Sequence, residues 1–178
     1  MKTLKEHIDN NILNEALKDH DKGIKQMLEI FSNSCSGVQS KLFKQKLNDA
    51  DSVDIESIYD VLNEEEIEMI KKYVRPKPKC CYENSYKLAD LLYNHDIKYV
   101  EGYLNMKGLP IEHAYNCIDG KYVDITIEIA LGKNVKEDTY IKIGEFDVSE
   151  VRNVLLENGY YGNIYDSIFL KKYKETIK

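Results

Sequence analysis

Residues 110–129, PIEHAYNCIDGKYVDITIEI, decide the fold that this sequence predicts. Asp119 and Gly120 stand between two runs of alternating apolar residues, and this dipeptide strongly favours a two-residue β-hairpin turn. With both residues in the turn, Ile118 faces Lys121, and the two strands pair outward from there. The stretch therefore predicts an antiparallel hairpin with a defined register.

This register places a histidine beside an aspartate. Counting back from the turn, Tyr115 faces Asp124. Because alternate residues of a strand share a face, His113 lies on the face of Asp124, as a diagonal neighbour roughly 7 Å away. A three-residue turn would put the two side chains on opposite faces. A histidine held by a carboxylate is a base with a fixed tautomer, so the pair is a candidate catalytic site.

A candidate nucleophile lies upstream, in CCYENSYKLADLL, residues 80–92. The apolar spacing from Tyr82 to Asn94 predicts a helix, with a cysteine pair at its start. A free thiol has a pKa of about 8.5, and both a helix N-terminus and a nearby imidazolium lower it. The unpaired N–H groups of the first helical turn can also hold an oxyanion.

The two cysteines differ in the helix stripe that each one starts. Cys81 is in line with small and apolar residues, which suit packing on a sheet: Ser85, Leu88, Ala89 and Leu92. Cys80 is in line with a more polar set: Asn84, Lys87 and Leu91. We therefore favour Cys81 as the nucleophile and keep Cys80 as the alternative.

The residues before this helix are predicted to be mainly helical. Residues 1–74 carry apolar side chains at helical spacing, interrupted by polar breaks at 32–37 and 48–54. A helix at 38–47 lies between the breaks, and the run 62–74 contains the capping-box pair Asn63 and Glu66. Residues 75–79, RPKPK, then form an extended connector, because proline disfavours a helix at the preceding residue.

After this helix the apolar period changes to two. The predicted strands are 97–105, 110–118, 121–131 and 139–146, and two helices follow, at 149–158 and from 163 onward. The predicted fold class is α+β: a helical N-terminal half, a central helix on an antiparallel sheet of about four strands, and C-terminal helices. We expect a helical region at 1–75 and a core at 76–178, or one compact domain that contains both.

Composition narrows the classes of function. The chain has 178 residues, 43% of them hydrophobic, and a net charge of −6, which argues against a nucleic-acid or anionic-membrane partner. No apolar run approaches the ~20 residues that span a bilayer, and the charged N-terminus has no signal-peptide core. We therefore expect a cytoplasmic protein with reduced thiols.

The order of these motifs resembles that of a known enzyme superfamily. A helix-initial cysteine followed by a histidine and an aspartate on neighbouring strands is similar to the circularly related papain-like and transglutaminase-like cysteine proteins. HAYNCIDGKYVDIT, with His113, Tyr115, Asp124 and Thr126, looks like the His-to-Asp hairpin of transglutaminase-like domains. CYENS, residues 81–85, is similar to the nucleophile segment of arylamine N-acetyltransferases. The resemblance covers about residues 80–128.

The resemblance implies acyl transfer through a thioester, with Cys81 as nucleophile, His113 as base and Asp124 as its partner, and with no cofactor or metal. It leaves open a protease, amidase, deamidase or transglutaminase-like transferase, acting on a protein or peptide. Two features of the family are missing. No glutamine precedes Cys81 as papain's second oxyanion donor, and KPK stands where the acetyltransferases have arginine-glycine-glycine, which argues against acetyl-coenzyme A.

Two other functions stay open at this point. The fold could be a non-enzymatic scaffold whose helical half binds a protein partner. Cys80, Cys81 and Cys117 could instead contribute to a structural zinc site, although adjacent cysteines chelate one ion poorly.

Several other polar residues have simpler interpretations. Three histidines in charged segments are expected at the surface: His7, His20 and His95. Three residues of the predicted strands could line a pocket: Glu101, Tyr103 and Asn116.

Overall fold

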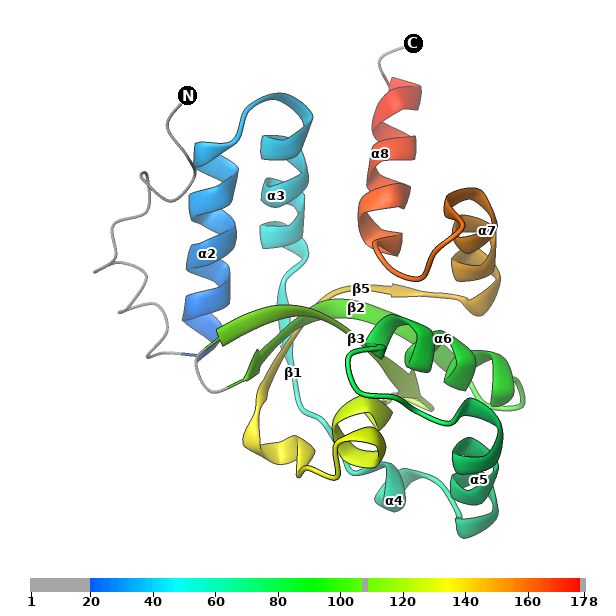
Figure 1. The fold of residues 1–178 in the computed structure, drawn as a ribbon. Helices are drawn as coiled ribbons and strands as arrows, with labels where there is room; N and C mark the ends of the chain where they lie inside the picture. Colours follow the sequence, from blue (N-terminus) through cyan, green and yellow to red (C-terminus); the bar gives the residue numbers. More distant parts are fainter. Residues whose placement is uncertain (1–19, 107–108, 177–178) are drawn as a thin grey trace.

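A five-stranded antiparallel sheet forms the centre of the molecule, with helices before and after it in the chain (Figure 1). The structure is a computed structural model and describes residues 20–106 and 109–176. The central helix packs on the sheet, which confirms the predicted α+β class. The helical pattern expected in residues 1–19, and His7 with it, lies outside the described residues.

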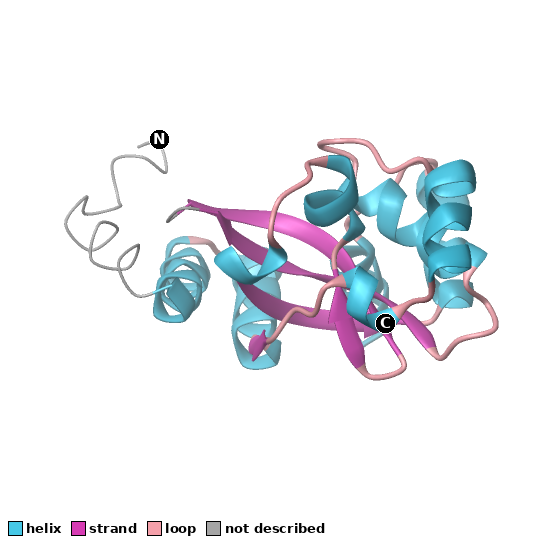
Figure 2. Ribbon diagram, turned by 90° about the horizontal axis from the view of Figure 1, so that it is seen from below, coloured by secondary structure: helices cyan, strands magenta, loops and turns pink. Residues whose placement is uncertain are grey.

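The strands follow the spatial order β1-β5-β2-β3-β4. Their bounds are β1 Asp51–Val53, β2 Ile97–Met106, β3 Leu109–Ile118, β4 Lys121–Val123 and β5 Thr139–Phe146. The two long strands β2 and β3 pair along their whole length, from Ile97 opposite Ile118 to Met106 opposite Leu109. Figure 2 shows the strands curving across the middle of the molecule, with helices gathered towards both ends of the sheet.

The helices agree with the predicted positions to within a few residues, except where noted below. Their bounds are α2 His20–Ser34, α3 Gly37–Asp49, α4 Ile58–Val61, α5 Glu64–Met69, α6 Cys81–Leu91, α7 Val148–Asn158 and α8 Ile164–Thr176. A π-helical turn, Ile70–Val74, extends α5, and the predicted capping box between Asn63 and Glu66 is present. Two further short turns, Thr126–Ala130 and Val135–Glu137, lie between β4 and β5.

The core has layers on both faces of the sheet. On one face, α2 packs Ile24 and Leu28 against strand residues that include Tyr103 and Ile141. Helix α6 buries Leu88, Ala89 and Leu92 in a cluster with Ile97 and Ile118. On the opposite face, residues of β2, β3 and β5 pack with side chains from the turns after β4: Val100, Leu104, Tyr115, Cys117, Tyr140, Ile127 and Val135.

A β-bulge at Ile143 of β5 lies beside the β2 residue that pairs with the predicted histidine. Gly102 pairs with His113, and the pairing of β2 with β5 shifts register between Glu101 and Gly102. A Cβ atom on Gly102 would lie 1.9 Å from the carbonyl oxygen of Ile141, so only glycine fits this close approach.

The predicted strand 121–131 is wrong beyond Val123. The chain turns at Asp124, because its Oδ1 accepts hydrogen bonds from the backbone N–H groups of Thr126 (2.9 Å) and Ile127 (3.1 Å). This side chain-to-backbone turn competes with the strand ladder, and a helical turn follows instead. Ile125 and Ile127 of this alternating run are still buried, but they contribute to two different clusters.

The predicted break at 48–54 contains a strand. Asp51–Val53 forms β1 and pairs with β5, and Ile55 pairs with Tyr122. The N-terminal region therefore adds an edge strand to the sheet and is not wholly helical. The division of the chain at residue 75 stays a prediction.

Candidate active site

The β3–β4 hairpin has the predicted register. Ile118 pairs with Lys121, and the two turn residues have positive φ angles, 50° at Asp119 and 82° at Gly120. Positive φ at both positions is the mark of a type I′ turn, which asparagine, aspartate and glycine favour. His113 and Asp124 consequently meet: Nε2 of the histidine lies 2.6 Å from Oδ2 of the aspartate.

Asp124 is buried and fully hydrogen bonded. Its side chain is 1% exposed. Oδ1 accepts the two backbone N–H groups of the turn, and Oδ2 accepts the Tyr140 hydroxyl at 3.0 Å in addition to the His113 ring. A buried charge is tolerated only when it is paired and bonded in this way. The carboxylate is therefore held in place by contacts within the protein itself.

The third predicted residue reaches the other side of the imidazole. Cys81 is the first residue of α6, its side chain is half-buried, and its thiol is hydrogen bonded to the His113 ring. Because Nε2 is taken by Asp124, Nδ1 is the nitrogen that remains for the thiol. Three segments of the chain thus bring one sulfur, one imidazole and one carboxylate into a single line of hydrogen bonds.

The groups that contact His113 favour the charged form of its imidazole. Burial alone would lower the pKa of His113, but the Asp124 carboxylate and the Cys81 thiol outweigh it and raise the pKa to about 10. The imidazole is 4% exposed and lies against the rings of Tyr115 and Tyr140, which shield these interactions from water.

The start of α6 leaves backbone donors beside the thiol. Cys80 is the N-cap residue, and its side chain makes no capping hydrogen bond. The N–H groups of the first turn of any helix have no partner within the helix, and together with the helix dipole they attract a developing negative charge.

The other cysteines have different surroundings. Cys117, towards the turn end of β3, is buried among apolar residues, and burial raises the pKa of its thiol. No group of three or more His, Cys, Asp or Glu side chains in residues 20–106 and 109–176 is placed to hold a metal ion, so the zinc alternative has no site there.

Sequence reasoning missed two residues that hold the site. Tyr140 comes from β5 and bonds to Asp124, and Asn84 comes from α6 and bonds to Thr126 at 3.0 Å. Neither has a recognisable signal in the sequence, since Tyr140 is one of fourteen tyrosines and Asn84 is one polar residue in an amphipathic helix.

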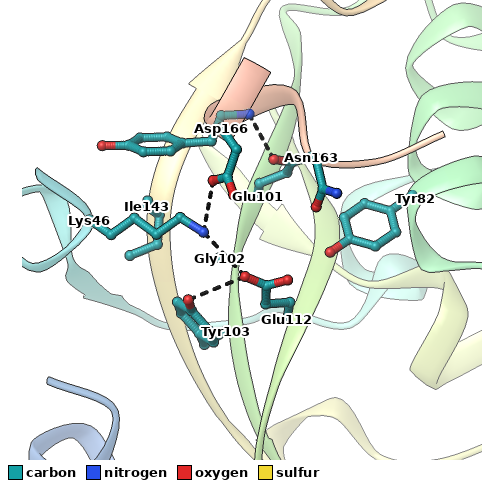
Figure 3. A pocket seen from close by; sticks show the side chains of 10 residues that line it. Lys46, Tyr82, Glu101, Gly102, Tyr103, Glu112, Ile143, Asn163 and Asp166 are labelled. Atoms are coloured by element: carbon teal, nitrogen blue, oxygen red, sulfur yellow. Dashed lines mark hydrogen bonds and ion pairs between the residues drawn. The ribbon is translucent and has the colours of Figure 1, made fainter. Parts of the chain in front are cut away.

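A small cavity lies beside strands β2 and β3 (Figure 3). It has a volume of about 20 Å³, and its lining includes Tyr82, which follows Cys81, and Glu112, which precedes His113. Figure 3 shows the buried ammonium of Lys46 between Glu112 and Asp166, at 3.2 and 2.8 Å.

Two of the three predicted pocket residues line this cavity. Glu101 and Tyr103 do so, whereas Asn116 packs under α6 and donates to the carbonyl oxygen of Ser85. Glu101 is itself buried and accepts the first backbone N–H groups of α8, those of Ile164 and Tyr165.

Comparison of the chain with protein-family models, curated proteins and solved structures found no match. None of the described helices combines the length and the apolar character that crossing a bilayer requires.

Proposed function

We propose that the protein is a cysteine-dependent acyl-transfer enzyme that works through Cys81, His113 and Asp124. The observation that supports this most is the hydrogen-bonded line from the Cys81 thiol through the His113 ring to the Asp124 carboxylate. A nucleophile, a base and a group that orients the base are the parts that covalent catalysis requires. The resemblance to transglutaminase-like and papain-like proteins points to the same roles.

The proposed reaction has two halves. His113 already holds its second proton at neutral pH, so Cys81 attacks the carbonyl carbon of an amide or ester as the thiolate partner of an imidazolium. The tetrahedral oxyanion is held by N–H groups at the start of α6. His113 then gives the proton to the leaving amine or alcohol as the bond to it breaks, which leaves a thioester on Cys81.

In the second half, water or an amine attacks the thioester. His113 takes a proton from the attacking group and keeps it as the carbon–sulfur bond breaks, which restores the thiolate and the imidazolium. Water as acceptor gives hydrolysis, as in a protease, amidase or deamidase. An amine as acceptor gives a transferase, and a protein or peptide is the substrate class we favour. Neither route uses a cofactor.

The first test is the reactivity of each thiol. Iodoacetamide labels thiolates, and an ordinary cysteine with a pKa of about 8.5 is less than about 1% ionised at pH 6. We expect Cys81 to be alkylated at this pH at least tenfold faster than Cys35, measured by peptide mass spectrometry. Cys80→Ala should keep this reactivity, and His113→Ala should remove it. Uniform slow labelling of all four cysteines would contradict the proposal.

The second test is acyl transfer itself. With p-nitrophenyl acetate as a simple acyl donor, we expect one acetyl group on Cys81 in the wild-type protein and none in Cys81→Ala. A non-enzymatic scaffold would show no preferential acylation of residue 81, and its biological effect would survive the Cys81→Ala substitution.

A further inference from the structure

Asn84 lies one turn after Cys81 on α6 and is 2% exposed. Its side-chain amide makes three hydrogen bonds to two other segments of the chain. Oδ1 accepts the backbone N–H of Lys77 at 3.1 Å, and Nδ2 donates to the carbonyl oxygen of Lys77 at 2.8 Å and to Oγ1 of Thr126 at 3.0 Å. One buried amide therefore fixes the positions of both segments relative to α6.

The first segment is the connector that leads into the nucleophile. Residues 75–79 have no regular secondary structure, apart from a turn, and at each end a non-glycine residue has a positive φ, 51° at Arg75 and 63° at Lys79. L-residues rarely adopt this conformation unless the surrounding structure imposes it. The pair of bonds from Asn84 to Lys77 anchors the middle of this connector, three residues before Cys80.

The second segment is the turn that carries the carboxylate. The backbone N–H of Thr126 donates to Asp124, and the hydroxyl of the same threonine accepts from Asn84. Asp124 in turn bonds to His113, whose ring bonds to Cys81 on the helix that also carries Asn84. The bonds thus form a closed ring, and Asn84 is the point where the helix of the thiol is joined to the turn of the aspartate.

We infer that Asn84 is a positioning residue for the proposed reaction: it sets the distance between the Cys81 thiol and the His113–Asp124 pair by tying the start of α6 to both the connector and Thr126. The inference rests on the proposed function. It assigns Asn84 no contact with the reacting atoms.

Asn84→Asp tests the inference with little change in shape. The aspartate keeps an acceptor for the N–H of Lys77 but replaces the donor that faces the Lys77 carbonyl and the Thr126 hydroxyl. Displacement of a reacting group by about 1 Å can slow a reaction roughly a hundredfold. We expect Asn84→Asp to slow the alkylation of Cys81 at pH 6 by roughly ten- to a hundredfold, at a temperature where circular dichroism shows the variant folded.

Asn116→Asp is the matched control. Asn116 is also fully buried, and its Nδ2 donates to the carbonyl oxygens of Ser85 and Lys98, so the substitution removes the same kind of donor beside the same helix. Asn116→Asp should lower stability and leave the alkylation rate of Cys81 within about threefold of wild type. The rate should be kept because Asn116 does not join the connector to the turn at Asp124.

Thr126 provides a second route if Asn84→Asp does not fold. Thr126→Val removes the acceptor and should slow Cys81 alkylation at pH 6, whereas Thr126→Ser keeps the hydroxyl and should restore the wild-type rate and pH profile. Wild-type rates in Asn84→Asp and Thr126→Val would overturn the inference alone. Absence of preferential Cys81 labelling in the wild-type protein would overturn the proposed function, and this inference with it.

Discussion

The β3–β4 hairpin contributes to two histidine–carboxylate clusters that differ in almost every physical respect. His113 and Asp124 lie within the hairpin and are 4% and 1% exposed. His95 bridges Asp119 in the hairpin turn and Glu66 at the start of α5, at 2.7 and 2.8 Å, and its side chain is 19% exposed. The charged segment around His95 predicts only a surface position and gives no sign of these two contacts.

The difference lies in what the second ring nitrogen contacts. Both nitrogens of His95 are bonded to carboxylates, so its ring has no nitrogen left to exchange a proton with a substrate. His113 uses one nitrogen for a carboxylate, and its ring is also bonded to a thiol. The first arrangement joins a helix to a turn, and the second is the arrangement that covalent catalysis uses.

The largest loss of stability in this comparison is expected from Asp124→Asn. The substitution leaves the buried His113 without its carboxylate and places an amide donor among groups that donate to residue 124. Breaking a buried ion pair costs about 3 kcal/mol or more, so we expect a loss of that size in the free energy of unfolding, measured in urea. Asp119→Asn changes the exposed cluster in the same way and should cost much less. Equal losses in the two variants would show that burial does not distinguish the clusters.

A smaller effect is expected from Tyr140→Phe, which removes one hydrogen bond from Asp124. A bond to a charged group contributes about 1.5–3 kcal/mol, so we expect a loss near the lower end of this range and slower Cys81 alkylation at pH 6. Tyr115→Phe is the matched control, because the buried hydroxyl of Tyr115 has no hydrogen-bond partner among residues 20–106 and 109–176. This variant should be as stable as wild type or more stable. Equal losses in the two phenylalanine variants would contradict the role assigned to Tyr140.

The smallest effect is the pH dependence contributed by His95. Hydrogen bonds to Asp119 and Glu66 raise the pKa of His95, and the same bonds lower the pKa values of the two carboxyl groups. A raised histidine pKa stabilises the fold fully below the unfolded value of about 6.5, and this stability is lost as the pH rises through the folded pKa. The two carboxyl groups, whose pKa values are lowered, stabilise the fold fully above about pH 4.3. This stability is lost as the pH falls through their folded pKa values.

The cluster therefore contributes most between about pH 4.3 and 6.5. We expect the difference in unfolding free energy between wild type and His95→Gln to be largest near pH 5.5 and to shrink towards pH 9. A constant difference over this range would contradict the assignment. The His113 pair also loses stability as the pH rises towards its raised pKa, but it does so in both proteins and cancels in the difference.

The parts of the site that are local in sequence were predictable. Asp119 and Gly120 fix the register of the hairpin, and the register alone places His113 beside Asp124. The helix start at Cys81 follows from the apolar spacing after the connector. These elements depend on neighbours a few residues away, where turn chemistry and periodicity are strong signals.

The parts that failed depend on competition or on distant contacts. The alternation in 121–131 predicts a long strand, but Asp124 bonds to the backbone two and three residues ahead and ends it. Strand β1 is three residues long, too short to show a period, and exists because β5 offers it an edge. The bonds from Tyr140 and Asn84 join residues 16 and 42 positions apart, and no local pattern encodes them.

The central claim is that Cys81, His113 and Asp124 behave as one electrostatic unit, and a nitrogen NMR titration of the histidine rings tests it most directly. The account predicts that His113 stays doubly protonated well above pH 8, and that Cys81→Ala lowers the pKa of His113 while that of His95 is unchanged. A His113 ring that loses its proton near pH 6.5 in the wild-type protein, or that titrates identically with and without the thiol, would contradict it.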